Sequence, residues 1–114
     1  MSLERVLNTL ESFGLSRVES EVYVYIAKAG PSRLKDLSNA LRMTKVQLHS
    51  TLQNLEKKGI VTSKPERSAL FSALAFEELI NRYVELNIEQ AKIIKETRQE
   101  LLDNWRKMGK QNNT

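Results

Sequence analysis

The sequence predicts a mainly α-helical fold with one small β-hairpin and a long helix near its C-terminal end. Two capping boxes, each followed by apolar residues at helical spacing, predict short helices in the first half of the chain. Two β-prone segments on either side of a proline-containing turn, residues 60–63 and 70–74, predict the hairpin. Residues 76–108 contain no proline or glycine, and they predict the long helix.

Two helices are predicted at the start of the chain. The first ends at Gly14, and a capping box formed by Ser16 and Glu19 opens the second. Gly30 ends the second helix, and residues 32–33 are expected to be extended. The residues of the second helix that we expect in the core are Val18, Val22, Tyr23, Tyr25, Ile26 and Ala29.

Residues 34–58 are predicted to form a helix–turn–helix. The inner face of its first helix holds Leu34, Leu37 and Leu41. Thr44 and Gln47 form a second capping box, which opens the second helix. At about 100° per residue, Leu48, Leu52 and Leu55 share the apolar side of that helix. The opposite, outward side holds Val46, Ser50, Gln53 and Lys57. A helix with an apolar back and short hydrogen-bonding side chains in front can enter a DNA major groove.

A hairpin directly after a helix–turn–helix is the wing of a winged helix–turn–helix. We therefore divide the chain into a winged helix–turn–helix domain of residues 1–75, a long coiled-coil-like dimerisation helix of residues 76–110 and a frayed tail of residues 111–114. Residues 64–68 are the turn of the wing.

The long helix repeats apolar residues at alternating intervals of four and three, the spacing of a coiled-coil seam. The seam is formed by Ile80, Val84, Asn87, Ala91, Ile94, Arg98, Leu101, Trp105 and Met108. In a single chain such a seam would leave an apolar band in water. We expect a homodimer to cover it; the alternative is that the helix folds back on its own domain. Asn87 and Arg98 are polar seam positions, which often fix register.

Composition and charge exclude several classes of function. The net charge is +4, but residues 28–67 alone carry nine basic and three acidic residues, which suits a polyanionic partner. Without cysteine there is no disulfide and no thiolate metal site, and His49 is the only histidine. No catalytic constellation or glycine-rich phosphate loop is visible, so we expect neither an enzyme nor a cofactor. Because no signal-like or membrane-spanning apolar run is visible, we expect a cytoplasmic protein without a membrane partner.

The residues expected to contact double-stranded DNA lie mostly on the second helix of the helix–turn–helix. Base edges are expected to meet Val46, Gln47, Ser50 and Gln53, with Thr44, His49 and Asn54 beside them. Phosphates are expected to meet Arg33, Lys45, Lys57, Lys64 and Arg67. An exposed valine at position 46 suits contact with a thymine methyl group.

Several short motifs over residues 10–82 carry a family resemblance. They are Gly14-Leu15-Ser16, Glu19, Val22-Tyr23, Gly30-Pro31, Leu34-Lys35-Asp36-Leu37, Leu48, Leu52, the run from Leu55 to Val61, Arg67, Phe71, Ala73 and Glu77-Glu78. With them the chain resembles the TrmB-type archaeal transcriptional regulators in their N-terminal DNA-binding domain, and is MarR-like in the broad sense. The chain departs from the pattern at Arg42, where glycine commonly makes the turn, at Glu66 near the usual wing glycine, and at Ala69 and Leu70, which replace basic residues.

Two functions are consistent with these residues. The first is a sequence-specific DNA-binding transcriptional regulator that acts as a homodimer on an inverted-repeat operator. The second is a winged-helix protein-interaction module in a transcription-related assembly, with little DNA affinity of its own. The basic helix–turn–helix favours the first, and the modest net charge and the weakly basic wing favour the second. Sugar sensing belongs to another domain of the family and is not carried over; the residues indicate no particular effector.

Overall fold

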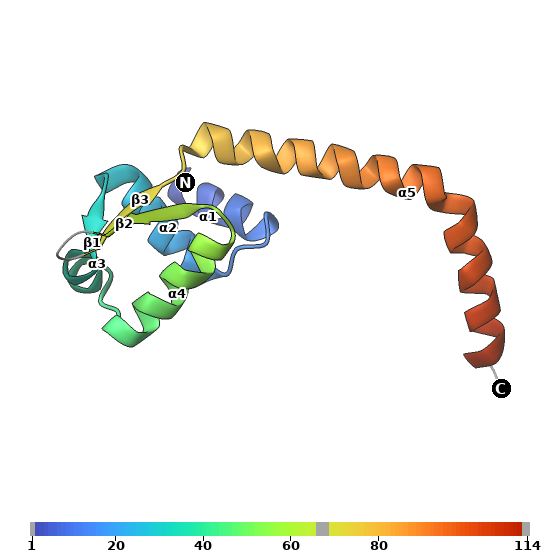
Figure 1. Cartoon of the computed structure of the whole chain (residues 1–114), viewed down its shortest axis with the longest axis horizontal. Helices are drawn as coiled ribbons and strands as arrows, with labels where there is room; N and C mark the ends of the chain where they lie inside the picture. Colours follow the sequence, from blue (N-terminus) through green and yellow to red (C-terminus); the bar gives the residue numbers. More distant parts are fainter. Residues whose placement is uncertain (1, 66–68, 113–114) are drawn as a thin grey trace. The chain divides into compact units, whose positions relative to one another are not determined.

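The computed structural model describes residues 2–65 and 69–112 (Figure 1). Its elements follow in the order α1 (Ser2–Ser12), α2 (Arg17–Ala29), β1 (Ser32–Arg33), α3 (Leu34–Leu41), α4 (Lys45–Lys57), β2 (Val61–Lys64), β3 (Leu70–Ala73) and α5 (Phe76–Asn112). The chain packs as two units, one ending at Leu79 and the other beginning at Ile80. The predicted fold class, mainly helical with a small wing and a long last helix, is confirmed.

Both predicted capping boxes are formed. At the start of α2, Ser16 Oγ accepts from the Glu19 N–H at 3.0 Å, and Glu19 Oε1 accepts from the Ser16 N–H at 2.8 Å. At the start of α4, Thr44 Oγ1 accepts from the Gln47 N–H at 3.1 Å, and Gln47 Oε1 accepts from the Thr44 N–H at 3.4 Å. Each box satisfies backbone donors that a helix start leaves unpaired, so these four residues fix where the two helices begin.

The buried face of α2 differs from the predicted one. Val22 and Ile26 are buried as expected, but Val18 is 45% exposed and Ala29 is also exposed. Tyr25 is half-buried, whereas Tyr23 is buried, and its hydroxyl donates to the Leu74 carbonyl oxygen at 2.7 Å. The buried face of α2 is rotated from the predicted one because the helix packs against α1, α4 and β3 together. Periodicity within one helix does not reveal these neighbours. Burial raises the pKa of Tyr23 to about 12.

One continuous core joins the helices and the sheet of the first unit. Its buried apolar residues are Leu10, Leu15, Val22, Tyr23, Ile26, Leu37, Leu48, Leu52, Leu55, Ile60, Val61, Phe71 and Leu79. Of the three leucines expected inside α3, Leu37 is fully buried, and Leu34 and Leu41 are half-buried. All three leucines expected on the back of α4 are buried, so the core holds that helix by one face.

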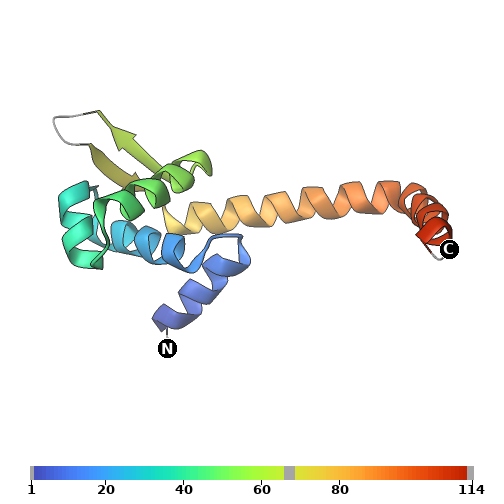
Figure 2. The same ribbon diagram turned by 90° about the horizontal axis from the view of Figure 1, so that it is seen from below.

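The sheet has three antiparallel strands in the order β1–β3–β2. Residues 32–33, expected only to be extended, form an edge strand: Ser32 pairs with Phe71, and Arg33 pairs with Leu70. The β2–β3 hairpin lies beside α4, as Figure 2 shows. Of the predicted wing turn, residues 66–68 lie outside the described residues.

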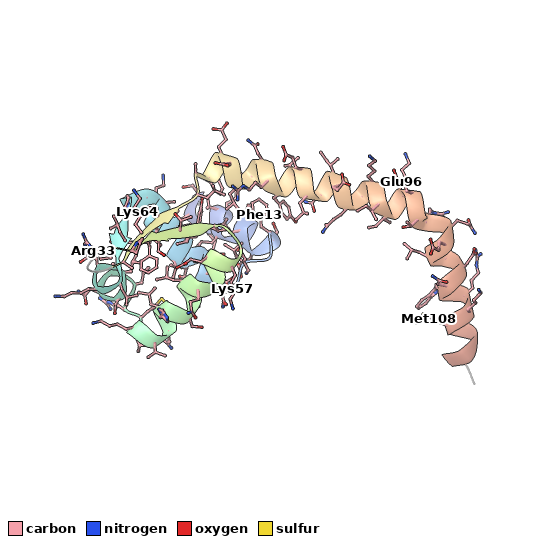
Figure 3. All side chains as sticks on the ribbon, in the orientation of Figure 1. Phe13, Arg33, Lys57, Lys64, Glu96 and Met108 are labelled. Atoms are coloured by element: carbon pink, nitrogen blue, oxygen red, sulfur yellow. The ribbon has the colours of Figure 1, made fainter. Side chains whose placement is uncertain are left out.

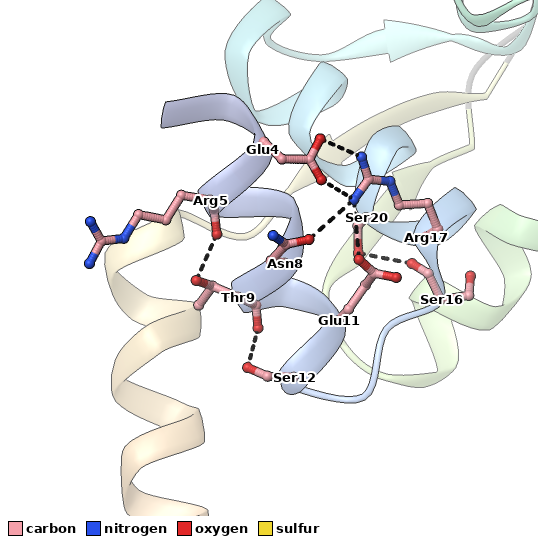
Figure 4. Close-up of polar contacts among 9 residues, drawn as sticks. All are labelled: Glu4, Arg5, Asn8, Thr9, Glu11, Ser12, Ser16, Arg17 and Ser20. Carbon is pink, nitrogen blue, oxygen red and sulfur yellow. Dashed lines mark hydrogen bonds and ion pairs between the residues drawn. The ribbon is translucent and has the colours of Figure 1, made fainter. Parts of the chain in front are cut away.

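Ion pairs join α1 to α2 and α2 to the end of α4. Arg17 donates to both carboxylate oxygens of Glu4, at 2.8 and 2.9 Å, and to Glu11 at 3.2 Å (Figure 4). The hydrogen bond from Arg17 lowers the pKa of Glu4. Lys58 Nζ lies 2.7 Å from Glu19 Oε1, and that carboxylate is almost fully buried. The first pair is exposed and contributes little, whereas the second ties the two capped helices together.

The second unit consists of α5 from Ile80 onward. Its side chains are largely exposed in the single chain, and they include the bulky apolar residues Val84, Leu86, Ile88, Ile93, Ile94, Leu101, Trp105 and Met108. Among residues 2–65 and 69–112, no helix combines the length and apolar character needed to cross a membrane.

Candidate nucleic-acid interface

Helix α4 divides into an inner and an outer face as the sequence predicts. Leu48, Leu52 and Leu55 are at most 1% exposed, so the helix is seated firmly on the core. The outward side chains Val46, Ser50, Gln53 and Lys57 are all exposed. Val46 is 82% exposed, so its methyl groups are open to a partner. The outward face therefore offers short polar side chains, one methyl-bearing side chain and one cation.

The capping box changes the role of two predicted contact residues. Thr44 and Gln47 hydrogen-bond to each other's backbone and thus define the first turn of α4. Gln47 accepts through Oε1, so its Nε2 group remains chemically available as a donor. His49 and Asn54 are exposed, as expected for residues at the sides of the outward face.

The turn that precedes α4 contains the one left-handed non-glycine residue of the described chain, Arg42. Its backbone lies at φ 54° and ψ 44°, and its N–H donates to the Ser38 carbonyl oxygen, which ends α3. A left-handed conformation costs a residue with a Cβ atom about 1 kcal/mol. Arg42 stands where glycine is common in the resembling family, and its left-handed backbone is the conformation that glycine adopts without this cost.

Cations lie at both ends of α4. Lys45 is exposed in the first turn, which contains no acidic residue, and Lys57 is exposed in the last turn. At 1.5 Å per residue, their Cα atoms are separated by about 18 Å along the helix axis. The partial positive charge of the helix N-terminus adds to that of Lys45, so an anion is favoured there.

Two more of the predicted phosphate contacts lie on the two outer strands of the sheet. Arg33 of β1 and Lys64 of β2 both pair with Leu70 of β3, one from each side. Their backbones are therefore two strand spacings apart, about 10 Å, and their side chains leave the sheet on the same face. Figure 3 labels both residues on the sheet, with Lys57 at the end of α4. Arg67, the remaining predicted phosphate contact, lies outside the described residues.

A groove beside α4 was not anticipated from the sequence. It has a volume of about 570 Å³ and lies between the start of α2, the turn around Met43 and one side of α4. Its lining consists of Val18, Glu21, Leu41, Met43, Val46, Gln47, Ser50 and Thr51. Val18 was expected in the core, but its side chain is exposed and lines this groove. Only the three-dimensional packing of α2 against α4 brings these residues together.

The helix–turn–helix formed by α3 and α4, followed by the β2–β3 hairpin, defines a winged helix–turn–helix. A sequence model of the family described as "Sugar-specific transcriptional regulator TrmB" matches residues 10–77. The chain belongs to this family. It is 28% identical over 98 residues to the HTH-type sugar sensing transcriptional regulator TrmBL1 of Pyrococcus furiosus. The match covers 86% of the chain but only 29% of that relative, so the chain spans less than a third of its length.

Solved structures show the same fold. The structure of the ST1889 protein of the archaeon Sulfolobus tokodaii superposes on 81% of this chain and on 99% of the ST1889 chain. The TM-score is 0.66 and the sequence identity is 16%. TrmBL2, described as an archaeal chromatin protein with a novel mode of DNA binding, matches 89% of the chain and 40% of its own, with a TM-score of 0.67 and 23% identity. The transcriptional regulator Tm0710 of Thermotoga maritima matches 99% of the chain and 89% of its own, with a TM-score of 0.59 and 22% identity.

Proposed function

We propose that this chain is a sequence-specific DNA-binding transcriptional regulator that places α4 in the major groove. The observation that carries the proposal is the separation of faces on α4: three fully buried leucines hold the helix, and Val46, Ser50 and Gln53 project from it. Side chains of this length can reach base edges, and Lys45 and Lys57 at the helix ends can reach phosphates. Family membership and the names of the relatives support this proposal.

We also propose that two copies of the chain associate through α5. The seam residues Val84, Ile94, Leu101, Trp105 and Met108 are each about half to two-thirds exposed in the single chain. An apolar band of this length is rare on a monomer's surface, and its four–three spacing matches a coiled-coil partner. A second copy of α5 would cover it, and the homodimer would carry two copies of α4.

A homodimer with two-fold symmetry predicts an inverted-repeat operator. The half-site centres should lie about 10 base pairs apart, or a multiple of this, so that both major grooves face the protein. Inserting five base pairs between the half-sites should therefore weaken binding strongly in an electrophoretic or anisotropy assay, whereas inserting ten should restore part of it. Equal affinity for all three spacings would contradict the dimeric arrangement.

The dimer itself is tested by Leu101→Asp, which places a charge in the seam and should dissociate the pair. Sedimentation equilibrium at micromolar concentration should give a dimer for the unmodified chain and a monomer for the variant. Gln99→Asp, which adds the same charge at an exposed position outside the seam, should leave the dimer intact. A monomeric unmodified chain, or dissociation by both variants alike, would contradict the proposed interface.

The second candidate is a winged-helix module that binds protein. It is favoured by the start of the returning wing strand, where Ala69, just before β3, and Leu70, its first residue, replace the basic residues of the resembling family and are half-buried. The two candidates differ in the salt dependence of DNA affinity. A plot of log K against log salt with a slope of several units supports the regulator, because each neutralised phosphate releases counterions. A slope near zero, or no measurable binding, supports the protein module.

A further inference from the structure

We infer that the groove beside α4 is a binding site for a small molecule that joins an apolar body to a cationic group, and that its occupation competes with DNA. The proposal that a ligand binds depends only on the groove. The competition rests on the proposed function, because it assumes that α4 contacts DNA.

The size and lining of the groove suit such a ligand. Its volume of about 570 Å³ lies within the range of about 300–1,000 Å³ usual for small-molecule sites. Val18 and Leu41 contribute apolar surface with Met43 and Val46, and Val18 and Val46 are left 45% and 82% exposed by the fold. Covering these four side chains would remove apolar surface from water, which favours a ligand with an apolar body.

Glu21 sets the charge of that ligand. It is the single charged residue in the lining, and it is exposed on the same side of α2 as Val18, three positions earlier. Neither a hydrogen bond nor an ion pair joins its carboxylate to another of the described residues. An unpaired carboxylate beside an apolar surface attracts an ammonium or amidinium group and repels an anion. It also makes this groove unsuited to a DNA phosphate, although cations lie at both ends of the adjacent helix.

The groove shares residues with the outward face of α4. Val46, Gln47 and Ser50 line the groove, and all three are among the residues expected to contact base edges. A ligand that covers them and a major groove that surrounds them cannot occupy the same space. The coupling is reciprocal, so operator DNA would weaken ligand binding by the same factor by which the ligand weakens DNA binding.

The charge requirement can be tested with three probes that share an indole body. Tryptamine is cationic, indole-3-ethanol is neutral and indole-3-propionate is anionic. Titrations of the full-length chain, followed by amide chemical shifts in ¹⁵N-labelled protein, should place the largest changes at Val18, Glu21, Met43 and Val46. Tryptamine should bind more tightly than indole-3-ethanol by up to about fivefold, the upper end of what an exposed ion pair contributes. Indole-3-propionate should bind more weakly than either.

Glu21→Gln should make tryptamine and indole-3-ethanol bind equally, whereas the control Glu85→Gln, an exposed glutamate on α5, should preserve the difference. Both residues are exposed, so both variants are expected to fold. Equal binding of the cationic and anionic probes to the unmodified chain, or shift changes confined to residues outside the lining, would overturn the site.

The competition is tested with operator DNA at constant ionic strength. At a tryptamine concentration of ten times its Kd for the unmodified chain, the apparent Kd for DNA should rise about elevenfold for each α4 that must be free, which is about 120-fold for a dimer that uses both. At the same concentration the rise should be smaller for Glu21→Gln. Unchanged DNA affinity at saturating tryptamine would overturn the competition and leave the binding site standing. A chain that binds the probes as expected but binds no DNA in their absence would instead show that the proposed function is wrong.

Discussion

Helices α4 and α5 are both amphipathic, but the single chain covers the apolar face of only one of them. On α4 the three stripe leucines are at most 1% exposed, because α2, α3 and β2 pack over them. On α5 the bulky apolar seam residues beyond Ile80 remain about half or more exposed. Apart from Val46, the side chains left for a partner are therefore polar or basic on the outward face of α4, whereas those left on the seam of α5 are mainly apolar.

This difference underlies the different partners that we propose for the two helices. Exposed polar and basic groups are satisfied by a hydrated, charged partner such as DNA, and their contribution depends on salt. Exposed apolar residues at heptad spacing are satisfied by another helix, and their contribution grows with the apolar area buried. The same alternation of apolar and polar residues would thus serve the two proposed functions, depending on which face the fold has already buried.

The largest expected effect is on the free energy of unfolding. It comes from shortening one apolar side chain on the apolar face of α4 and one on the apolar face of α5. In the Leu101→Asp background, expected to be monomeric, Leu52→Ala should lower the free energy of unfolding by about 2–5 kcal/mol, because it leaves a cavity in the core. Ile94→Ala in the same background should lower it by less than about 0.5 kcal/mol, because the side chain is already in water. Urea denaturation measures both, and equal losses would remove the distinction between the helices.

The next effect separates two kinds of residue within the outward face of α4. Ser50→Ala and Gln53→Ala should each relax the preference for one base pair by about 1–3 kcal/mol. Lys57→Ala should weaken binding to specific and random DNA alike and lower the salt slope by about one unit. Fluorescence anisotropy on operator variants measures these changes. If all three variants lost affinity equally on every sequence, α4 would be contacting only the DNA backbone.

A smaller effect is expected at the turn before α4. Arg42→Gly should raise the free energy of unfolding by about 1 kcal/mol, because glycine adopts φ 54° without the Cβ penalty. Ala40→Gly, two residues earlier and inside α3, should lower it by about the same amount, because glycine there loses helix propensity. Thermal or urea unfolding of the pair gives opposite signs if the left-handed turn is strained. If both variants were less stable than the unmodified chain, the turn at Arg42 would not be strained.

The smallest expected effect is a pH dependence that belongs to the core of the first unit. Burial raises the pKa of Glu19, but the hydrogen bonds from Lys58 and from the Ser16 N–H lower it by more, so the net pKa lies below its ordinary value. A lowered folded-state pKa stabilises the fold above about pH 4.5, and this contribution is lost as the pH falls through the folded pKa. Urea midpoints measured between pH 6 and 3 should therefore fall less steeply for Glu19→Gln than for the unmodified chain. Parallel curves would show that the carboxylate does not carry this dependence.

Local signals predicted the parts of the molecule that depend on neighbours in the sequence. The two capping boxes set the starts of α2 and α4 correctly, because each is completed within four residues. The inner and outer faces of α4 followed from helical spacing alone, since a single stripe of leucines marks the inner face. The set of candidate base contacts was therefore visible before any tertiary packing was known.

The features that were missed depend on residues far apart in the sequence. Val18 was placed in the core because it lies on the stripe of Val22, but no element covers it there, and it borders the groove instead. The pairing of Arg33 with Leu70 and the contact of Glu19 with Lys58 each join distant segments. Periodicity describes one element at a time, so it cannot show which elements meet.

The pairing of β1 with β3 has a consequence for how the first unit opens. Ser32 pairs with Phe71, so α3, α4 and β2 all lie within a loop of chain that this pairing closes. Closing such a loop costs conformational entropy once. Each further contact inside the closed loop then forms with a smaller loss of entropy. The wing and the helix–turn–helix should consequently behave as one cooperative unit in hydrogen exchange, with the amides of α4 and β3 becoming exposed in the same opening event. The surface proposed to face DNA would then be lost or kept as a whole, with no partly unfolded form retaining α4 without its wing.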